Sequence, residues 1–157
     1  MGLITWIENT GLAEYIRVSA LGYPLMITLH SLGLAIMVGL SVVLSLRVLG
    51  LFSAIPYSSL YKLLKVAWIG FIVNFISGGC LFAANATTFI VDSTFLIKMA
   101  MVIVGAICVA IMQGMIKTAL ASGQGAEGAG GNIKIVAWIS IGAWTVGMVM
   151  GRLIAYI

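Results

Sequence analysis

The side chain in this chain with the most chemical potential is His30, the only histidine, which lies within the apolar stretch YPLMITLHSLGLAIMVG at residues 23–39. The next charged residue after it is Arg47. An imidazole in such surroundings can bind a metal ion or the iron of a haem, or it can simply donate a hydrogen bond to the main chain. The residues expected to lie near His30 in the folded chain distinguish between these roles.

Composition defines the surroundings of His30. Hydrophobic residues make up 62% of the chain and charged residues 8%, with a mean hydropathy of +1.21. Soluble domains carry about 25% charged residues, so this composition predicts an integral membrane protein. The net charge of +4 comes from eight scattered Lys and Arg residues rather than from a basic patch. Soluble enzyme folds and nucleic-acid binding are therefore excluded.

The chain is predicted to be all-α, with four transmembrane helices in a single up-down bundle that spans residues 1–157. A membrane-spanning helix needs about 20 apolar residues, and the stretches of that kind lie at about 22–49, 64–90, 94–120 and 134–157. Residues 3–19 mix apolar and charged side chains and predict a helix that lies on the membrane. Residues 121–132 are rich in glycine and predict a flexible loop. No basic segment precedes an apolar core at the N-terminus, so we expect no cleaved signal.

The distribution of cations predicts the orientation in the membrane. Five of the eight Lys and Arg residues lie on the side of the first and third connections, namely Arg47, Lys62, Lys65, Lys117 and Lys134. Cytoplasmic loops are enriched in Lys and Arg. Both termini are therefore expected to face the periplasm of a bacterial inner membrane.

Polar residues gather at the face that holds the termini. In a four-helix bundle the start of the first and third spans and the end of the second and fourth lie at the same face, which brings His30, Lys98 and Arg152 to similar depths. His30 is about 10 Å below the start of its helix at 1.5 Å per residue. Ionisable residues inside a membrane usually face the bundle interior or form a functional site.

Small and sulfur-containing residues accompany His30. Met26 and Gly33 share its helix face, and Gly33 is expected to leave room for a broad, flat group. Gly78 and Gly79 on the second span are expected to open another gap.

This set of residues suits a haem b. His30 would be its axial metal ligand, Lys98 and Arg152 would pair with its propionates, and Arg17 would be a third cation. A second axial ligand could be Met26, Met101 or Met148, or His30 of a second copy or a residue of a larger complex, or the position could stay open. A chlorin or a quinone at the same imidazole is a further alternative. The partner of such an electron-transfer subunit would be a quinone or a periplasmic electron carrier.

Structural alternatives stand beside this hypothesis. Small residues in membrane helices usually allow close helix packing, and cations near helix ends often extend to the interface. The chain could thus be a structural or assembly subunit of a membrane complex, or a small metal-handling permease that uses His30 and Met26. No nucleophile or acid–base pair is evident, so we expect no catalytic activity of its own.

The stretches YPLMITLHSLGLAIMVG, LSLRVLG, GGCLFAANATTFIVDSTFLIKM and GRLIAY resemble a family of small, largely uncharacterised bacterial membrane proteins. The shared features are a Tyr-Pro pair followed after five residues by His30, a Phe-x-x-Lys pattern that ends at Lys98, and a terminal Gly-Arg pair that ends at Arg152. Ser45 departs from the pattern, which tends to hold an acid there. The resemblance implies a four-helix bundle with an N-terminal interfacial segment. A more distant likeness is to b-type membrane cytochromes.

Overall fold

All regular elements in the described part of the chain are α-helices. The computed structural model describes residues 2–123, 132–154 and 156. The elements are α1 (Leu3–Glu8), α2 (Gly11–Val18), α3 (Gly22–Val48), α4 (Tyr57–Ala84), α5 (Ala86–Phe89), α6 (Ser93–Ala121) and α7 (Asn132–Leu153). Four of them, α3, α4, α6 and α7, are long and apolar enough to cross a membrane. This confirms the prediction of an all-α, multi-pass membrane bundle.

Several helix boundaries differ from those predicted. The N-terminal helix expected at 3–19 is divided into α1 and α2, because Thr10 starts a new helix by accepting a hydrogen bond from the Ala13 N–H. The second span begins at Tyr57, directly after Pro56, and not near residue 64. It ends before 90 because Asn85 leaves the helical region, with φ −145° and ψ 44°. The fourth helix ends at Leu153 rather than at 157. Most of the predicted loop at 121–132 lies outside the described residues.

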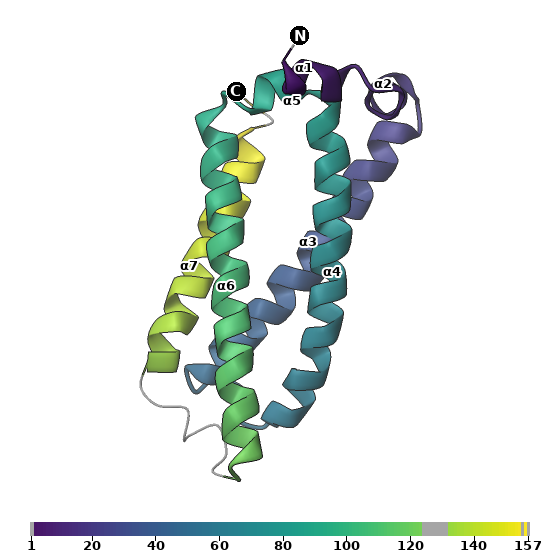
Figure 1. Cartoon of the computed structure of the whole chain (residues 1–157). Helices are drawn as coiled ribbons and strands as arrows, with labels where there is room; N and C mark the ends of the chain where they lie inside the picture. Colours follow the sequence, from purple (N-terminus) through teal and green to yellow (C-terminus); the bar gives the residue numbers. More distant parts are fainter. Residues whose placement is uncertain (1, 124–131, 155, 157) are drawn as a thin grey trace.

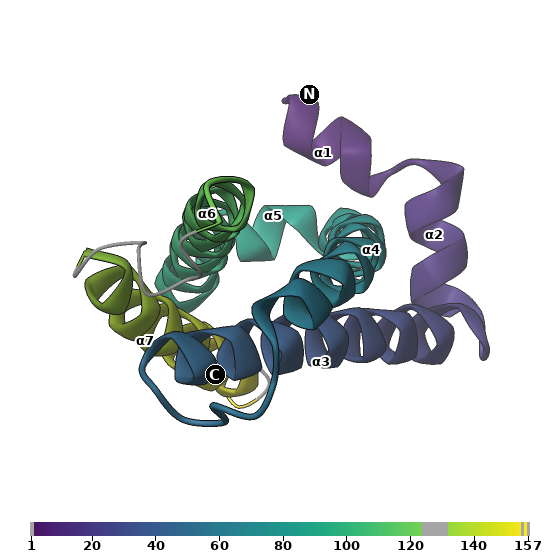
Figure 2. The same ribbon diagram turned by 90° about the horizontal axis from the view of Figure 1, so that it is seen from below.

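The long helices form two antiparallel pairs. Helix α3 packs along α4, and α6 packs along α7 (Figure 1). Contacts between α3 and α7 join the pairs, whereas α4 and α6 touch each other only sparsely. Seen from below, α5 bridges the ends of α4 and α6, and α2 lies beside α3 and α4 (Figure 2). Helix α3 thus starts at the end of the bundle where α7 ends, and we call this the N-terminal end.

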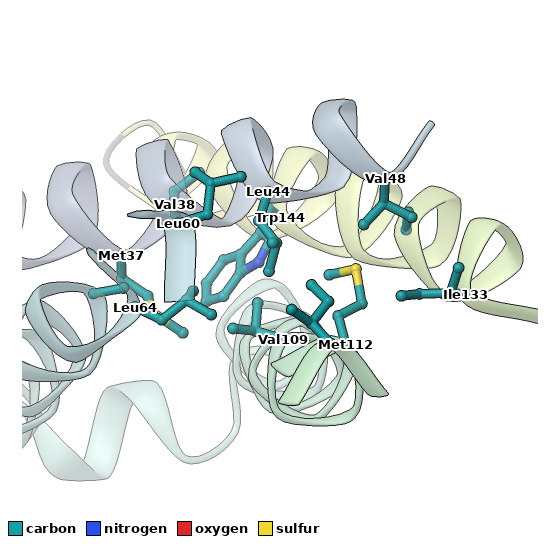
Figure 3. Packing of buried hydrophobic residues seen from close by; sticks show 13 residues of the cluster. Met37, Val38, Leu44, Val48, Leu60, Leu64, Val109, Met112, Ile133 and Trp144 are labelled. Atoms are coloured by element: carbon teal, nitrogen blue, oxygen red, sulfur yellow. The ribbon is translucent and has the colours of Figure 1, made fainter. Parts of the chain in front are cut away.

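The hydrophobic core lies in the half of the bundle away from the N-terminal end. Its fully buried members include Met37, Leu44, Leu64, Met112 and Trp144 (Figure 3). Trp144 of α7 lies against Gly105 of α6, where an added Cβ would be 2.7 Å from Trp144 Cε2. The well-packed core therefore fixes one half of the bundle, and His30 and Lys98 belong to the other half.

Polar contacts attach the short N-terminal helices to the end of α4 and to α5. The backbone N–H of Thr87 donates to Glu8 Oε2 at 2.8 Å, and Arg17 Nη1 donates to the Ala84 oxygen at 3.5 Å. Arg17 also pairs with Glu8 at 3.9 Å and with Glu14. These contacts lie where α4 ends, so α1 and α2 cover that end of the bundle as a strap.

Candidate functional site

His30 is held on α3 by a hydrogen bond to the neighbouring helix. Its Nδ1 atom lies 3.0 Å from the main-chain oxygen of Asn74 on α4. A carbonyl oxygen can only accept, so Nδ1 must carry the proton. In a neutral imidazole the second nitrogen, Nε2, then keeps its lone pair. Histidines that ligate metals are commonly oriented in this way by a backbone carbonyl.

The residues that enclose the imidazole also belong to α4. Gly78 lies against the ring, because an added Cβ would be 2.9 Å from His30 Cε1 and 3.1 Å from Nδ1. Ser77 Oγ is 3.5 Å from His30 Nδ1 and donates to the oxygen of Val73 at 2.6 Å. The Nδ1–Cε1 edge is thus enclosed by α4, and Nε2 lies outside these contacts.

Gly33 and Gly78 do not provide the gaps that the sequence predicts. An added Cβ at Gly33 would lie 2.6 Å from both the Asn74 nitrogen and the Gly70 oxygen, so the backbone of α4 already fills this position. The space at Gly78 is taken by the His30 ring itself. Gly79 differs, since nothing lies within 4 Å of its added Cβ. Two of the three glycines therefore serve helix packing and the placement of His30.

Lys98 of α6 packs over the end of α7. Its side chain is half-buried on α6 and crosses Gly151 of α7, where an added Cβ would be 3.4 Å from Lys98 Cε. No acidic side chain of the described residues forms an ion pair with Lys98. Lys98 is therefore a half-buried cation on the same end of the bundle as His30, without an ion-pair partner among the described residues.

The remaining predicted residues have other surroundings. Arg152 directly follows Gly151 and is exposed. Arg17 is engaged by Glu8, Glu14 and the Ala84 oxygen, so it is not a free cation for a propionate. Met26 lines an apolar cavity beneath α2 that does not include His30. The structure thus places Gly78 against His30, whereas Lys98 packs against Gly151 and Arg17 is engaged by other groups.

The sequence analysis did not identify Asn74 as the partner of His30. A usable signal was the antiparallel register of the first helix pair. Residues 30 and 74 are equally distant from residue 52, in the middle of the first connection, and should therefore lie opposite each other. Of Asn74, His30 bonds only to the main-chain oxygen, and every residue type carries such an oxygen, so the amino-acid type at position 74 gives no signal.

Within the described residues, no group of three or more His, Cys, Asp and Glu could hold a metal ion. A site at His30 would therefore depend on a ligand that brings most of its own donor atoms. Comparison with known protein families, with curated proteins and with solved structures finds no match.

Proposed function

We propose that this protein is a haem b-binding membrane subunit for electron transfer, with His30 as the axial ligand through Nε2. The observation that supports this most is the hydrogen bond between His30 Nδ1 and the Asn74 oxygen at 3.0 Å. It leaves Nε2 as the free nitrogen and holds the ring in one orientation. Tautomer and orientation together are what an axial imidazole requires.

A haem accounts for the donor set better than a bare metal ion. A bound Zn²⁺ needs three or four ligands from the protein. The porphyrin supplies four nitrogens itself, so one imidazole is enough to anchor the iron. With no further cluster of His, Cys, Asp or Glu in the described residues, the metal-handling permease is the weaker proposal.

The residues around His30 would have distinct roles toward the haem. The Asn74 carbonyl and Gly78 would fix the imidazole, and Lys98 would form a charge-assisted hydrogen bond with a propionate. Arg152, at the exposed end of α7, would bind the other propionate or a partner. The sparse contact between α4 and α6 is compatible with a ligand between the helix pairs. When bound, the haem would supply reversible one-electron exchange at its iron.

The second axial position and the partners follow as further parts of the proposal. Met101 or Met148, His30 of a second copy, or a residue of a larger membrane complex would complete the iron, or the position would stay open. Both termini would face the periplasm of a bacterial inner membrane, which puts His30 near the outer face. Electrons would then pass to or from a quinone or a periplasmic carrier.

The absorption spectrum tests this function directly. The protein purified in mild detergent should show the Soret absorption band of a haem b protein and should give a positive pyridine haem assay. A colourless preparation after expression with excess haem precursor would contradict haem binding.

A structural subunit is the second candidate, and a specific observation favours it. Gly33, Gly78 and Arg17 all serve contacts between helices. On this alternative the His30–Asn74 bond only sets the register of α3 against α4. Colourless protein that copurifies in fixed stoichiometry with other membrane subunits would support this role.

A further inference from the structure

An apolar cavity of about 260 Å³ lies beneath α2, between α3 and α4. Leu12, Tyr15 and Ile16 of α2 form its roof, and Leu25 and Met26 of α3 and Cys80 of α4 form its walls. Figure 2 shows α2 beside α3 and α4, on the side of the bundle away from α7. The cavity is therefore built from three helices and faces the lipid side of the first helix pair.

The position of the cavity relates it to His30. Met26 precedes His30 by four residues on the same helix face, which is about 6 Å along the axis. Cys80 is on α4, close in sequence to Gly78, which contacts the imidazole. A molecule in the cavity would thus lie roughly one helical turn from the imidazole, toward the N-terminal end.

The chemistry of the lining selects the class of ligand. The lining is apolar except for the thiol of Cys80 and the hydroxyl of Tyr15, so the main body of a ligand must be apolar. The nearby charged groups on the strap are Glu8, Glu14 and Arg17, with more negative than positive charge. The one cation of the strap, Arg17, is already paired with both carboxylates, so the strap offers no free positive charge to an anionic phosphate head, and a neutral head needs none.

Volume narrows the class further. The cavity is slightly smaller than the range of about 300–1,000 Å³ that is typical of pockets for drug-sized ligands. It would hold a single ring with the start of a tail, while the rest of the tail would lie along the exposed Leu21 and Leu25 in the lipid.

We infer that this cavity binds the head of a neutral isoprenoid quinone. The inference rests on the proposed function, because a quinone is the redox partner that a haem subunit can meet within the bilayer. Tyr15 and Cys80 are the lining residues whose side chains carry a hydrogen-bond donor, which a quinone carbonyl would accept from, and the apolar walls would contact the ring and the first part of the tail.

Binding of a benzoquinone with a decyl tail to the purified full chain tests the site. Cys80→Phe fills the cavity and should weaken binding by about tenfold or more, since an overpacked site rejects its ligand. The matched control is Ile76→Phe, one turn away on the same helix but 61% exposed and outside the cavity lining. The affinity of Ile76→Phe for the quinone should stay within about twofold of that of the parent chain.

Leu12→Trp is a second variant, because it narrows the cavity from the strap and leaves α3 and α4 unchanged. If Cys80→Phe fails to fold, as judged by gel filtration and circular dichroism, Leu12→Trp should still weaken quinone binding. Equal affinity of the folded variants and the parent chain would overturn the inference. Displacement of the quinone by equimolar diacylglycerol would also overturn it, by making the cavity an unselective lipid site.

The haem and the quinone have separate readouts. The Soret band reports the haem at His30, whereas ligand binding reports the cavity. Loss of the band with retained quinone binding would contradict only the proposed function. A normal band with quinone binding that is insensitive to Cys80→Phe would contradict only the cavity.

Discussion

The Nδ1 atom of His30 donates a hydrogen bond to the main-chain oxygen of Asn74, 3.0 Å away on the neighbouring helix. The bond forms one turn from the place where Gly33 brings the backbones of α3 and α4 together. Close helix packing and the orientation of the imidazole are therefore coupled, and substitutions can test the two separately.

Gly33→Ala should destabilise the bundle. The new Cβ would lie 2.6 Å from main-chain atoms of α4, which cannot move without separating the helices. Overpacking of this kind costs about 1–3 kcal/mol. Gly39→Ala is the matched control on the same helix, because nothing lies within 4 Å of its added Cβ. The midpoint temperature of thermal unfolding in detergent should be lower for Gly33→Ala and unchanged or higher for Gly39→Ala. Equal stability of the two variants would argue against the tight α3–α4 contact.

Gly78→Ala should displace the imidazole, because its Cβ would lie 2.9 Å from His30 Cε1. Haem content per protein should fall, or the Soret maximum should shift. The adjacent Gly79→Ala adds the same methyl group where nothing lies within 4 Å, and its spectrum should match that of the parent chain. Identical spectra for both variants would show that the ring does not occupy the predicted position.

Lys98→Met should weaken haem binding while it keeps the methylene contact with Gly151. A hydrogen bond to a charged group contributes about 1.5–3 kcal/mol, which corresponds to roughly 10- to 150-fold in affinity. Lys117→Met, at the opposite end of α6, is the control and should have no effect. The measurement is haem retention during competition with apomyoglobin, and equal retention by both variants would remove Lys98 from the site.

Acid should loosen the strap formed by α1 and α2. Hydrogen bonds from Thr87, followed by the charge of Arg17, lower the pKa of Glu8 below its usual value. A carboxylate with a lowered pKa contributes stability above its unfolded pKa, and the contribution is lost as pH falls through the folded pKa. Amide exchange in α1 and α2, corrected for intrinsic pH effects, should therefore accelerate below the ordinary carboxylate range. Glu8→Gln should show fast exchange already at neutral pH. The same pH profile in Glu8→Gln and the parent chain would contradict this role of Glu8.

The sequence predicts the membrane-spanning helices well because hydropathy over about 20 residues is a strong local signal. It misses the division at Thr10, where a hydroxyl caps a new helix within a segment that mixes apolar and charged residues, and the break at Asn85, where the backbone leaves the helical region. The depth of His30 follows from counting residues along its helix. The role of Gly33 cannot be predicted in this way. A glycine that leaves room for a ligand and a glycine that allows close helix packing occur at the same spacing in the sequence. Arg17 illustrates the same limit, since two of its partners, Glu8 and the Ala84 oxygen, lie on α1 and α4.

The most direct measurement is the absorption spectrum of the parent chain beside that of His30→Ala. The parent should show a Soret band and bind about one haem per chain, or one per two chains if a second His30 completes the iron. His30→Ala should lose the band while it keeps the helical content and elution volume of the parent, and added imidazole should restore part of it. A band of equal strength in His30→Ala, or no band in either protein, would contradict the assignment of His30 as the axial ligand.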